Sequence, residues 1–207
     1  MARSGTQYKL FDEPVHFKSG LIYRPNFITP DEEEFLLEFI SQQRLRHATG
    51  GKEGEYTAQR RYKHFGWGFN DKSGELIPGP SLPRFLTRFS HRIEKWLDIS
   101  RGRVVEALIN EYTPGTPLGW HTDREQFEHI IGISLGSWAR MRFRPTQKRG
   151  EYDPKQVISL EIEPRSAYIM QDEVRWKWQH SVAATRALRY SITFRTLPSE
   201  ITLSKPS

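Results

Sequence analysis

An α+β fold with a β-sandwich or barrel core is predicted by the order of the hydrophobic patterns along this chain. Two stretches with helical periodicity lie in the first half, at residues 29–40 and 82–97. From Val104 onward the chain changes to short apolar runs separated by turn residues, which is typical of strands. Helices followed by a run of strands favour an α+β domain. Because no internal repeat or long linker interrupts the 207 residues, we expect a single domain over residues 1–207.

The first of the two helices has a complete start signal. Before it, residues 20–27 (GLIYRPNF) indicate a short strand that ends at Pro25. Thr29 then fits the N-cap position, Pro30 the first helical position and Glu32 the far end of a capping box. The apolar face beyond this start is expected to be buried, and it comprises Phe35, Leu36, Phe39 and Ile40.

The second helix is predicted from a longer apolar stripe. Ahead of it, three glycines among residues 48–58 indicate a loop, and Pro and Gly are again frequent at residues 74–83. Over residues 82–97 the apolar residues recur at helical spacing, which suits packing against a sheet. They are Leu82, Phe85, Leu86, Phe89, Ile93, Trp96 and Leu97.

Residues 59–70 (QRRYKHFGWGFN) interleave basic and aromatic side chains. Basic side chains contact phosphates and aromatic rings stack on bases, so this stretch is a candidate nucleic-acid contact. The same pattern is typical of a strand that presents an aromatic face to the core, and the stretch alone leaves both interpretations open. The residues concerned are Arg60, Arg61, Tyr62, Lys63, His64, Phe65, Trp67 and Phe69.

Seven strands are predicted in the second half of the chain. Each is a short apolar or alternating run bounded by turn residues. This succession of short strands predicts the sandwich or barrel. The predicted strands are residues 104–112, 130–135, 139–144, 156–163, 166–171, 176–182 and 189–197.

Composition narrows the classes of function. The net charge of +6 and the pI of about 9.6 favour an anionic partner, with nucleic acid first, although a basic excess also serves solubility alone. The chain has no cysteine, so any metal must be held by His, Asp or Glu. No run approaches the length of a membrane span, and the N-terminal segment lacks the apolar core of a secretion signal. We therefore expect a soluble cytoplasmic protein without membrane contact, or a nuclear one if the source is eukaryotic.

One stretch organises the chemistry, residues 108–123 (LINEYTPGTPLGWHTD). It places His121 and Asp123 two residues apart, after an apolar run and a Pro/Gly-rich turn. On a strand, residues i and i+2 point to the same face, so both side chains can reach one centre. One imidazole and one carboxylate are two of the three ligands of a 2-His-1-carboxylate facial triad, which holds Fe(II) and leaves positions open.

The second imidazole must come from another histidine. His180 is best placed, because it lies in the predicted strand 176–182, late in the same strand-rich half. A histidine beside tryptophans is also typical of a packed core residue, so the assignment of His180 depends on the next strand of the chain. The other histidines lie in the N-terminal arm, in loops, on a helix or next to the first pair, and they are His16, His47, His64, His91 and His129.

That next strand, predicted over residues 189–197, carries an Arg-x5-Arg pair. On a strand, Arg189 and Arg195 share one face with Ser191 and Thr193, and either face of the strand is free to point to solvent. A fixed guanidinium fork pairs well with a carboxylate, as the far carboxylate of 2-oxoglutarate requires. The order His-x-Asp, His and Arg-x5-Arg is therefore the layout that an Fe(II)/2-oxoglutarate site needs.

The C-terminal part of the chain resembles the AlkB family of Fe(II)/2-oxoglutarate-dependent dioxygenases. The resemblance covers residues 59–197 and keeps the order and approximate spacing of the motifs. It implies a double-stranded β-helix (jelly-roll) core over 104–197, with N-terminal helices and a nucleotide-recognition lid over 59–70. The matching elements are Asn110-x-Tyr112, His121-Thr-Asp123, ISLGS at 133–137, Arg175 ahead of His180, and Arg189-x5-Arg195.

The resemblance also implies which residues carry the chemistry. It makes His121, Asp123 and His180 the Fe(II) ligands, with 2-oxoglutarate and O2 as co-substrates. Arg189 is the expected partner of the distal carboxylate of 2-oxoglutarate. The full set of expected 2-oxoglutarate contacts is Asn110, Tyr112, Arg189 and Arg195.

Substrate contacts are expected in the lid and near the mouth of the iron site. Arg61 is a candidate substrate contact, and Tyr62, Phe65 and Trp67 are candidates for stacking on a base. Glu125 lies two residues past Asp123 and is a candidate contact to the base, with a solvated turn residue as the alternative.

A basic run in the predicted strand 139–144 is a further candidate for substrate binding. Arg140, Arg142 and Arg144 alternate with apolar residues and therefore share one face, and Lys148 and Arg149 lie just beyond them. Phosphate contact is the functional interpretation. The alternative is an edge strand that its charges protect against unwanted pairing.

The function that we expect is oxidative dealkylation of N-alkylated bases in single-stranded or damaged DNA or RNA by a monomer. Fe(II), O2 and 2-oxoglutarate would give succinate, CO2 and an aldehyde. Such chemistry is typical of DNA repair of alkylation damage. A base inside a duplex would have to be flipped out first. The alternatives are an RNA or tRNA base hydroxylase or demethylase, and an oxygenase of the same fold that acts on protein or small molecules.

Overall fold

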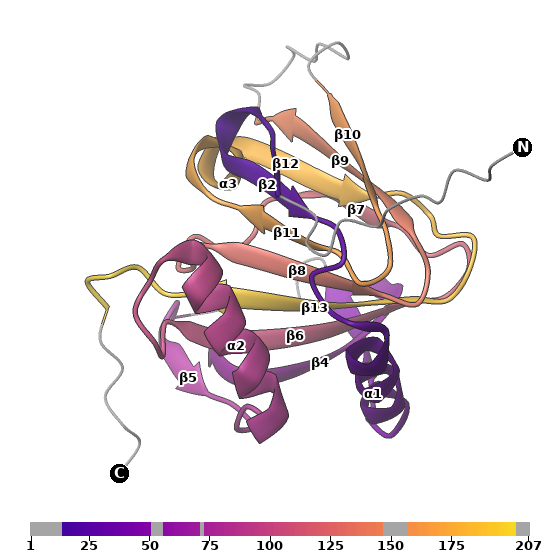
Figure 1. The fold of residues 1–207 in the computed structure, drawn as a ribbon, viewed down its shortest axis with the longest axis horizontal. Coiled ribbons are helices and arrows are strands. Elements are labelled where there is room, and N and C mark those ends of the chain that lie inside the picture. The colour runs from indigo at the N-terminus through magenta and orange to yellow at the C-terminus, as the bar shows by residue number, and fades with distance from the viewer. Residues whose placement is uncertain (1–13, 51–55, 71–72, 147–156, 202–207) are drawn as a thin grey trace, which may run out of the picture.

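The computed structural model describes residues 14–50, 56–70, 73–146 and 157–201, and two antiparallel sheets make up most of it (Figure 1). The smaller sheet has the order β10 (Ile158–Ile162), β9 (Ala139–Pro145), β12 (Trp178–Val182) and β7 (Leu118–His121). The larger sheet has the order β1 (Val15–His16), β2 (Leu21–Arg24), β11 (Ala167–Met170), β8 (Ile130–Leu135), β13 (Arg189–Thr196), β6 (Val104–Tyr112), β4 (Tyr56–Phe69) and β3 (Arg46–Gly50), and β5 (Leu76–Pro78) pairs with β4. This double sheet confirms the predicted α+β jelly-roll class.

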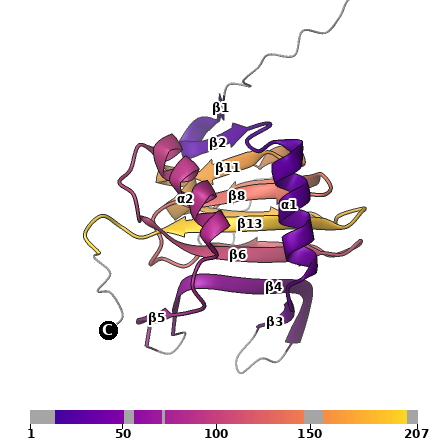
Figure 2. The same cartoon turned by 60° about the horizontal axis from the view of Figure 1, so that its bottom comes forward.

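Two helices cover one face of the larger sheet. α1 (Pro30–Ser41) and α2 (Arg84–Leu97) cross its strands on the side away from the smaller sheet (Figure 2). A short helix, α3 (Asp172–Lys177), leads into β12, and a 3-10 turn, η1 (Lys18–Gly20), leads into β2. No helix among the described residues has the length and apolar character needed to span a bilayer.

The start of α1 is capped as the sequence predicts. Thr29 Oγ1 accepts a hydrogen bond from the Glu32 backbone N–H at 3.2 Å, and Glu32 Oε2 accepts one from the Thr29 N–H at 2.9 Å. This capping box satisfies two backbone donors that the first turn leaves without partners. Leu36 and Ile40 are buried against the sheet, whereas Phe35 is half exposed and touches Phe85 of α2 edge-on.

Apolar side chains fill two layers, one on each face of the larger sheet. The first layer lies between the sheet and the helices and includes Leu36, Leu86 and Ile109. The second lies between the two sheets and includes Met141 and Phe143. Because both faces are covered, the central strand β8 is buried at every position, which explains its unbroken apolar sequence.

Two predicted segments differ from the structure, and the strand β7 is not predicted. Residues 48–50 and 56–58 belong to β3 and β4, so the predicted loop 48–58 is wrong at both ends, and residues 51–55 lie outside the described residues. The predicted strand 176–182 begins in α3 and becomes strand only at Trp178. β7 is an additional strand that the sequence pattern does not predict, because it has only four residues between a Pro/Gly-rich turn and a loop.

Candidate active site

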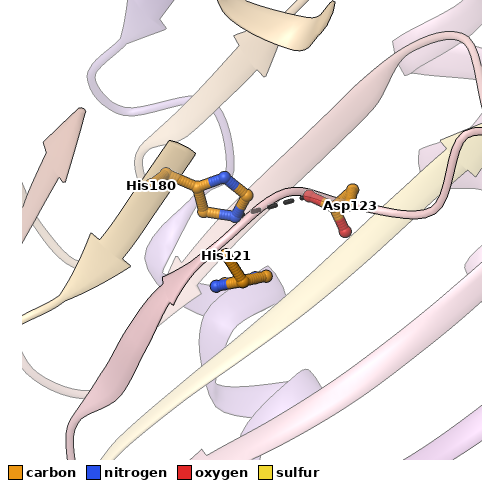
Figure 3. A group of neighbouring side chains, drawn as sticks. All are labelled: His121, Asp123 and His180. Carbon is orange, nitrogen blue, oxygen red and sulfur yellow. Dashed lines mark ion pairs between the residues drawn. The ribbon is translucent and has the colours of Figure 1, made fainter. Parts of the chain in front are cut away.

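The smaller sheet brings the two predicted histidine ligands together. His121 ends β7 and pairs across the strands with His180 of β12, and the two ring centroids are 4.2 Å apart. Asp123 lies in the loop just beyond β7, so it reaches the same place from a turn and not along the strand. One ligand atom from each of the three residues lies within 4.8 Å of the others (Figure 3).

The surroundings of each histidine suit metal binding. His121 Nδ1 lies 2.8 Å from the Gly119 carbonyl oxygen. Because a carbonyl can only accept, Nδ1 must carry the proton, which leaves the Nε2 lone pair for a metal. Burial lowers the pKa of His180 to about 3 in spite of the nearby Asp123 carboxylate, so this imidazole is neutral at pH 7.

Asp123 is held as a carboxylate by its neighbours. Burial alone would raise its pKa, but the charge and hydrogen bond of Arg195, together with the neighbouring histidine rings, outweigh burial, and the net pKa is well below the usual range. Arg195 donates to Asp123 Oδ1 at 2.6 Å, while Oδ2 lies 3.4 Å from His180 Nε2. One carboxylate oxygen is thus bound to the protein and the other faces the histidines.

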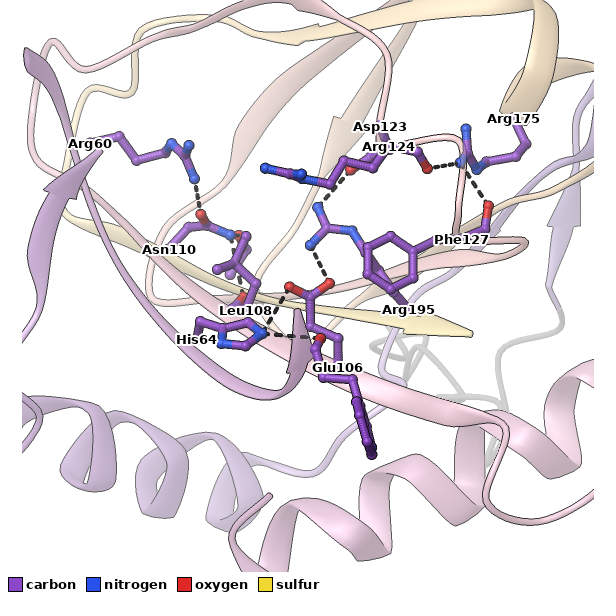
Figure 4. A network of polar contacts seen from close by, with 12 residues as sticks. Arg60, His64, Glu106, Leu108, Asn110, Asp123, Arg124, Phe127, Arg175 and Arg195 are labelled. Carbon is purple, nitrogen blue, oxygen red and sulfur yellow. Dashed lines mark hydrogen bonds and ion pairs between the residues drawn. The ribbon is translucent and has the colours of Figure 1, made fainter. Parts of the chain in front are cut away.

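Arg195 connects this centre to the larger sheet. Its second amino group donates to Glu106 Oε2 of β6 at 2.9 Å, and Glu106 Oε1 lies 3.3 Å from His64 Nε2 of β4 (Figure 4). Both carboxylates are buried, and each has a cation beside it. No motif singles out Glu106 in the sequence, because only the strand register shows that it faces Arg195.

The loop that carries Asp123 is fixed by Arg175 of α3. Its guanidinium donates to the backbone carbonyls of Arg124 at 2.5 Å and Phe127 at 2.7 Å (Figure 4). Arg175 is almost fully buried, so these bonds replace its lost hydration. The residue therefore orients the loop between the metal candidates and β8.

The predicted 2-oxoglutarate residues line up on two neighbouring strands of the larger sheet. Asn110 and Tyr112 lie on β6, directly opposite Ser191 and Arg189 of β13. Arg189 is 2% exposed, donates from Nε to Ser134 Oγ at 3.2 Å, and lies over the Tyr112 ring at 5.1 Å. The polar face of β13, whose direction the sequence pattern does not decide, therefore points inward.

These residues line one cavity of about 690 Å³. The three metal candidates and Arg189 all contribute to its wall, together with apolar side chains such as Ile130. A buried guanidinium without a carboxylate partner among the described residues is costly unless an anion joins it. The donor set therefore fits a divalent metal, and Arg189 fits the carboxylate of a bound acid.

Tyr168 is a cavity residue that the sequence does not suggest. It lies on β11, and its ring packs on Gly132 of β8, where a Cβ atom would come within 2.3 Å of the ring. Burial raises the pKa of Tyr168, so its hydroxyl stays protonated and can donate a hydrogen bond into the cavity. A tyrosine in one apolar run and a glycine in another are the only trace of this pair in the sequence.

The expected lid is part of β4, and its residues divide between the two faces of the sheet. Tyr62 lies opposite Asn110 and lines the cavity. Phe65 is buried beneath α1 against Phe39, so the expectation that it stacks on a base is corrected. Arg61 points to the same side as Phe65 and pairs with Glu111 at 2.6 Å, so its expected substrate contact is also corrected.

Trp67 and Glu125 also lie away from the cavity wall. Trp67 is half-buried and packs against the layer between the two sheets, so its expected stacking role stays a prediction that the cavity lining does not support. Glu125 is exposed and is not part of the lining, which favours the solvated turn residue. Instead, the lining includes two cations, Arg46 and Arg60, whose guanidiniums lie 5.2 and 6.0 Å from the centroid of the Tyr62 ring.

The predicted basic strand has its arginines on the outer face of the smaller sheet. Arg140 pairs with Glu161 of β10 at 3.1 Å, and both side chains are exposed. Arg142 and Arg144 lie beside Trp120 of β7. Lys148 and Arg149 lie outside the described residues.

Comparisons with known proteins agree with this geometry. A family model described as the 2OG-Fe(II) oxygenase superfamily matches residues 20–195. An uncharacterized protein, L905, of Acanthamoeba polyphaga mimivirus is 31% identical over 193 residues, which cover 84% of this chain and 83% of the viral protein.

Two vertebrate relatives match at lower identity. "Probable RNA/DNA demethylase ALKBH6" of Danio rerio is 27% identical over 77% of this chain and 68% of its own length. "tRNA (carboxymethyluridine(34)-5-O)-methyltransferase alkbh8" of Xenopus tropicalis is 28% identical over 79% of this chain, which spans only 25% of that protein. Among solved structures, OsALKBH1 has a TM-score of 0.69 and 14% identity over 89% of this chain and all of its own.

Proposed function

We propose that this chain dealkylates N-alkylated bases in single-stranded or damaged DNA or RNA. The chain belongs to the 2OG-Fe(II) oxygenase superfamily, and it is an AlkB-like dioxygenase that uses Fe(II), 2-oxoglutarate and O2. The observation that supports the proposal most is the shared cavity. Two histidines and an ionised aspartate lie in one part of its lining, the buried Arg189 lies in another, and the cations Arg46 and Arg60 also line it.

In this proposal His121, Asp123 and His180 hold Fe(II). The Gly119 carbonyl keeps His121 in the tautomer that offers Nε2, and Arg195 takes Asp123 Oδ1, so that Oδ2 remains for the metal. These contacts come from the protein alone, so they can organise the centre before the metal binds.

Arg189 binds the distal carboxylate of 2-oxoglutarate in this proposal, and its Nε bond to Ser134 keeps the guanidinium in place. Asn110 and Tyr112 lie beside it on β6 and offer an amide and a hydroxyl. When bound, Fe(II) with 2-oxoglutarate and O2 supplies an oxidation that hydroxylates the N-alkyl carbon, so that the base loses it as an aldehyde while 2-oxoglutarate leaves as succinate and CO2.

The substrate base enters past β4, where Tyr62 is the candidate for stacking and Arg46 and Arg60 are the candidates for phosphate contact. Residues 59–70 keep the proposed role of a lid on this basis, with Tyr62 as the side chain that faces the cavity. The printed name of the Danio rerio relative supports an RNA or DNA base as the substrate class.

A second candidate is an RNA or tRNA base hydroxylase or demethylase. The printed name of the Xenopus tropicalis relative, which refers to tRNA uridine, supports this candidate. A third candidate, oxygenation of a protein or small molecule by the same fold, has less support because the cations Arg46 and Arg60 line the cavity.

A substrate panel tests the proposal. N-methylated and unmethylated single strands of DNA and RNA, a tRNA, and the matching duplexes are compared for the succinate that they elicit from Fe(II)-loaded protein. We expect methylated single strands to increase succinate formation and to lose the methyl group. Stimulation by tRNA with retention of a hydroxylated base would favour the second candidate. A lack of stimulation by every nucleic acid would exclude both and leave the third.

A further inference from the structure

The outer face of the smaller sheet carries side chains that the cavity does not use. His121 and His180 line the cavity and Phe143 is buried between the sheets, so alternation places their neighbours Trp120, Ser181 and Arg142 on the outer face. The register pairs Ser181 with Arg142 and Gln179 with Arg144. Tryptophan, small serine and two arginines therefore lie side by side across three strands.

Contacts among these outer residues fix the two guanidiniums. That of Arg144 lies 4.3 Å from the centroid of the Trp120 ring, and that of Arg142 lies 5.2 Å from it. Arg144 also donates to Gln179 Oε1 from Nε at 3.0 Å and from an amino group at 2.8 Å. We call Trp120, Arg142 and Arg144 the outer platform.

Edge protection does not explain the charge of this strand. β9 pairs with β10 on one side and with β12 on the other, so it is not an edge of the smaller sheet. The edge-strand alternative for the basic run is therefore corrected. The Trp120 ring is a neutral group, so its contact orients the Arg142 guanidinium without cancelling positive charge, and the Gln179 amide holds the Arg144 guanidinium in place.

Arg142 and the neighbouring Arg140 differ in whether an acidic side chain pairs with them. Arg140, two residues earlier on the same face, pairs with Glu161. Arg142 has no ion pair with any of the described residues, and its Nε is buried without a hydrogen-bond partner among them. A stacked guanidinium of this kind on an outer face is suited to an external anion.

The platform lies next to the cavity mouth. β7 is the edge strand of the smaller sheet, with His121 on its inner side and Trp120 on its outer side. Thr122, which directly follows His121 in the chain, is exposed and lines the cavity. A strand of nucleic acid that leaves the cavity past Thr122 would meet Trp120 within a residue or two of protein chain.

We propose that the outer platform is a second contact surface for a nucleic-acid strand, at which Arg142 and Arg144 bind backbone phosphates and Trp120 positions their guanidiniums. This rests on the proposed nucleic-acid substrate and adds that nucleotides flanking the target are held outside the cavity. Arginine suits this role because its planar group can stack on a ring and present its N–H donors to phosphate at the same time.

The test measures binding of an unmodified 15-nucleotide single strand by fluorescence anisotropy over a range of salt concentrations. Each phosphate contact to a single strand contributes about −0.7 to the slope of log K against log salt. The Arg142→Ala/Arg144→Ala variant should flatten the slope by about 1.4, the value for two contacts. The matched control is Arg84→Ala/Arg88→Ala, which removes two exposed arginines from α2 and should leave the slope unchanged.

Two further variants separate positioning from charge. Arg142→Lys/Arg144→Lys keeps both charges, so it should keep most of the slope while binding more weakly, because a point charge does not stack as a guanidinium does. Trp120→Leu keeps both arginines, and it should lower affinity severalfold because it frees their guanidiniums. Thermal unfolding of each variant verifies that the sheet is intact.

The results also distinguish this inference from the proposed function, which succinate formation tests separately. An unchanged slope in Arg142→Ala/Arg144→Ala, or an equal loss in the α2 control, would overturn the platform even if the wild-type protein demethylates single strands. A slope that flattens only in the platform variant would support it, whichever base the cavity accepts.

Discussion

Arg195 donates a 2.6 Å hydrogen bond to Asp123 Oδ1 and, with its other amino group, a 2.9 Å bond to Glu106. One guanidinium thus ties the carboxylate of the candidate metal centre to β6. Such partners of ligand residues orient the ligand, and their loss typically lowers metal affinity about 10- to 100-fold.

The first prediction concerns this bridge. Arg195→Lys should lower Fe(II) affinity by about 10- to 100-fold, because one ammonium cannot span Asp123 and Glu106 as the guanidinium does. Anaerobic Fe(II) titration followed by tryptophan fluorescence measures the effect. Arg61→Lys is the control, since Arg61 forms an equally short ion pair on the other face of the same sheet. Equal affinities in the wild type and Arg195→Lys would show that the bridge does not organise the centre.

The second prediction concerns the co-substrate. Arg189→Ala should raise the KM for 2-oxoglutarate by about 10- to 100-fold, since hydrogen bonds to charged groups contribute about 1.5–3 kcal/mol. Arg189→Lys should recover only part of this, because lysine lacks the planar fork. The KM for the oligonucleotide should change much less in both variants. If the 2-oxoglutarate KM stays at the wild-type value in Arg189→Ala, the assignment of Arg189 is wrong, and Arg195 becomes the candidate partner of the distal carboxylate.

The chemistry of this site is more predictable from sequence than its surroundings. His121, Asp123 and His180 stand in a fixed order, and the structure brings all three together. Alternation along a strand explains only part of this, however, because Asp123 lies beyond the end of β7 and is placed by its loop and by Arg175. No sequence pattern indicates a role for Glu106, because only the pairing of two distant strands brings it to Arg195.

The substrate contacts are less predictable from the sequence than the metal candidates. Sequence alternation correctly places Tyr62 and Phe65 on different faces of β4, but it offers no means of deciding which face is core. The helices decide it, since α1 covers the face of Phe65 and leaves that of Tyr62 to the cavity. The absence of β7 from the predicted strands likewise conceals Trp120 as an outward residue.

The third prediction uses this difference between faces. Tyr62→Ala should weaken binding of a single strand by about 1–3 kcal/mol with little change in the salt dependence, as expected when a stacked ring is lost. Trp67→Ala should instead lower the melting temperature, because Trp67 packs between the sheets. Anisotropy titrations and thermal unfolding of both variants measure the two effects. A larger binding defect in Trp67→Ala than in Tyr62→Ala would reverse the assignment of the stacking residue.

The fourth prediction concerns stability and pH. The hydrogen bond from Arg92, at 2.5 Å, is the main reason that the pKa of Glu32 lies below its usual value, although partial burial opposes it. A carboxylate with a lowered folded-state pKa stabilises the protein above its unfolded pKa, and this contribution is lost as the pH falls through the folded value.

Glu32→Gln keeps a capping side chain but removes the charge, so it should destabilise the protein at pH 7 by at most about 1 kcal/mol, given the partial exposure of the pair. The difference from the wild type should shrink as the pH falls below about 4. Urea unfolding at a series of pH values measures it. A destabilisation that is constant down to pH 3 would mean that the charge of Glu32 does not contribute.

The most direct measurement of the central claim is the ratio of aldehyde to succinate formed on an N-methylated single strand. We predict one formaldehyde per succinate in the Fe(II)-loaded wild-type protein, and neither product in His121→Ala, Asp123→Ala or His180→Ala when their melting temperatures show an intact fold. His129→Ala is the control that should keep the wild-type ratio, since His129 bonds to Thr196 and lies outside the group of metal candidates. Near-normal product formation in His180→Ala, or succinate without formaldehyde in the wild type on every methylated strand, would contradict the account.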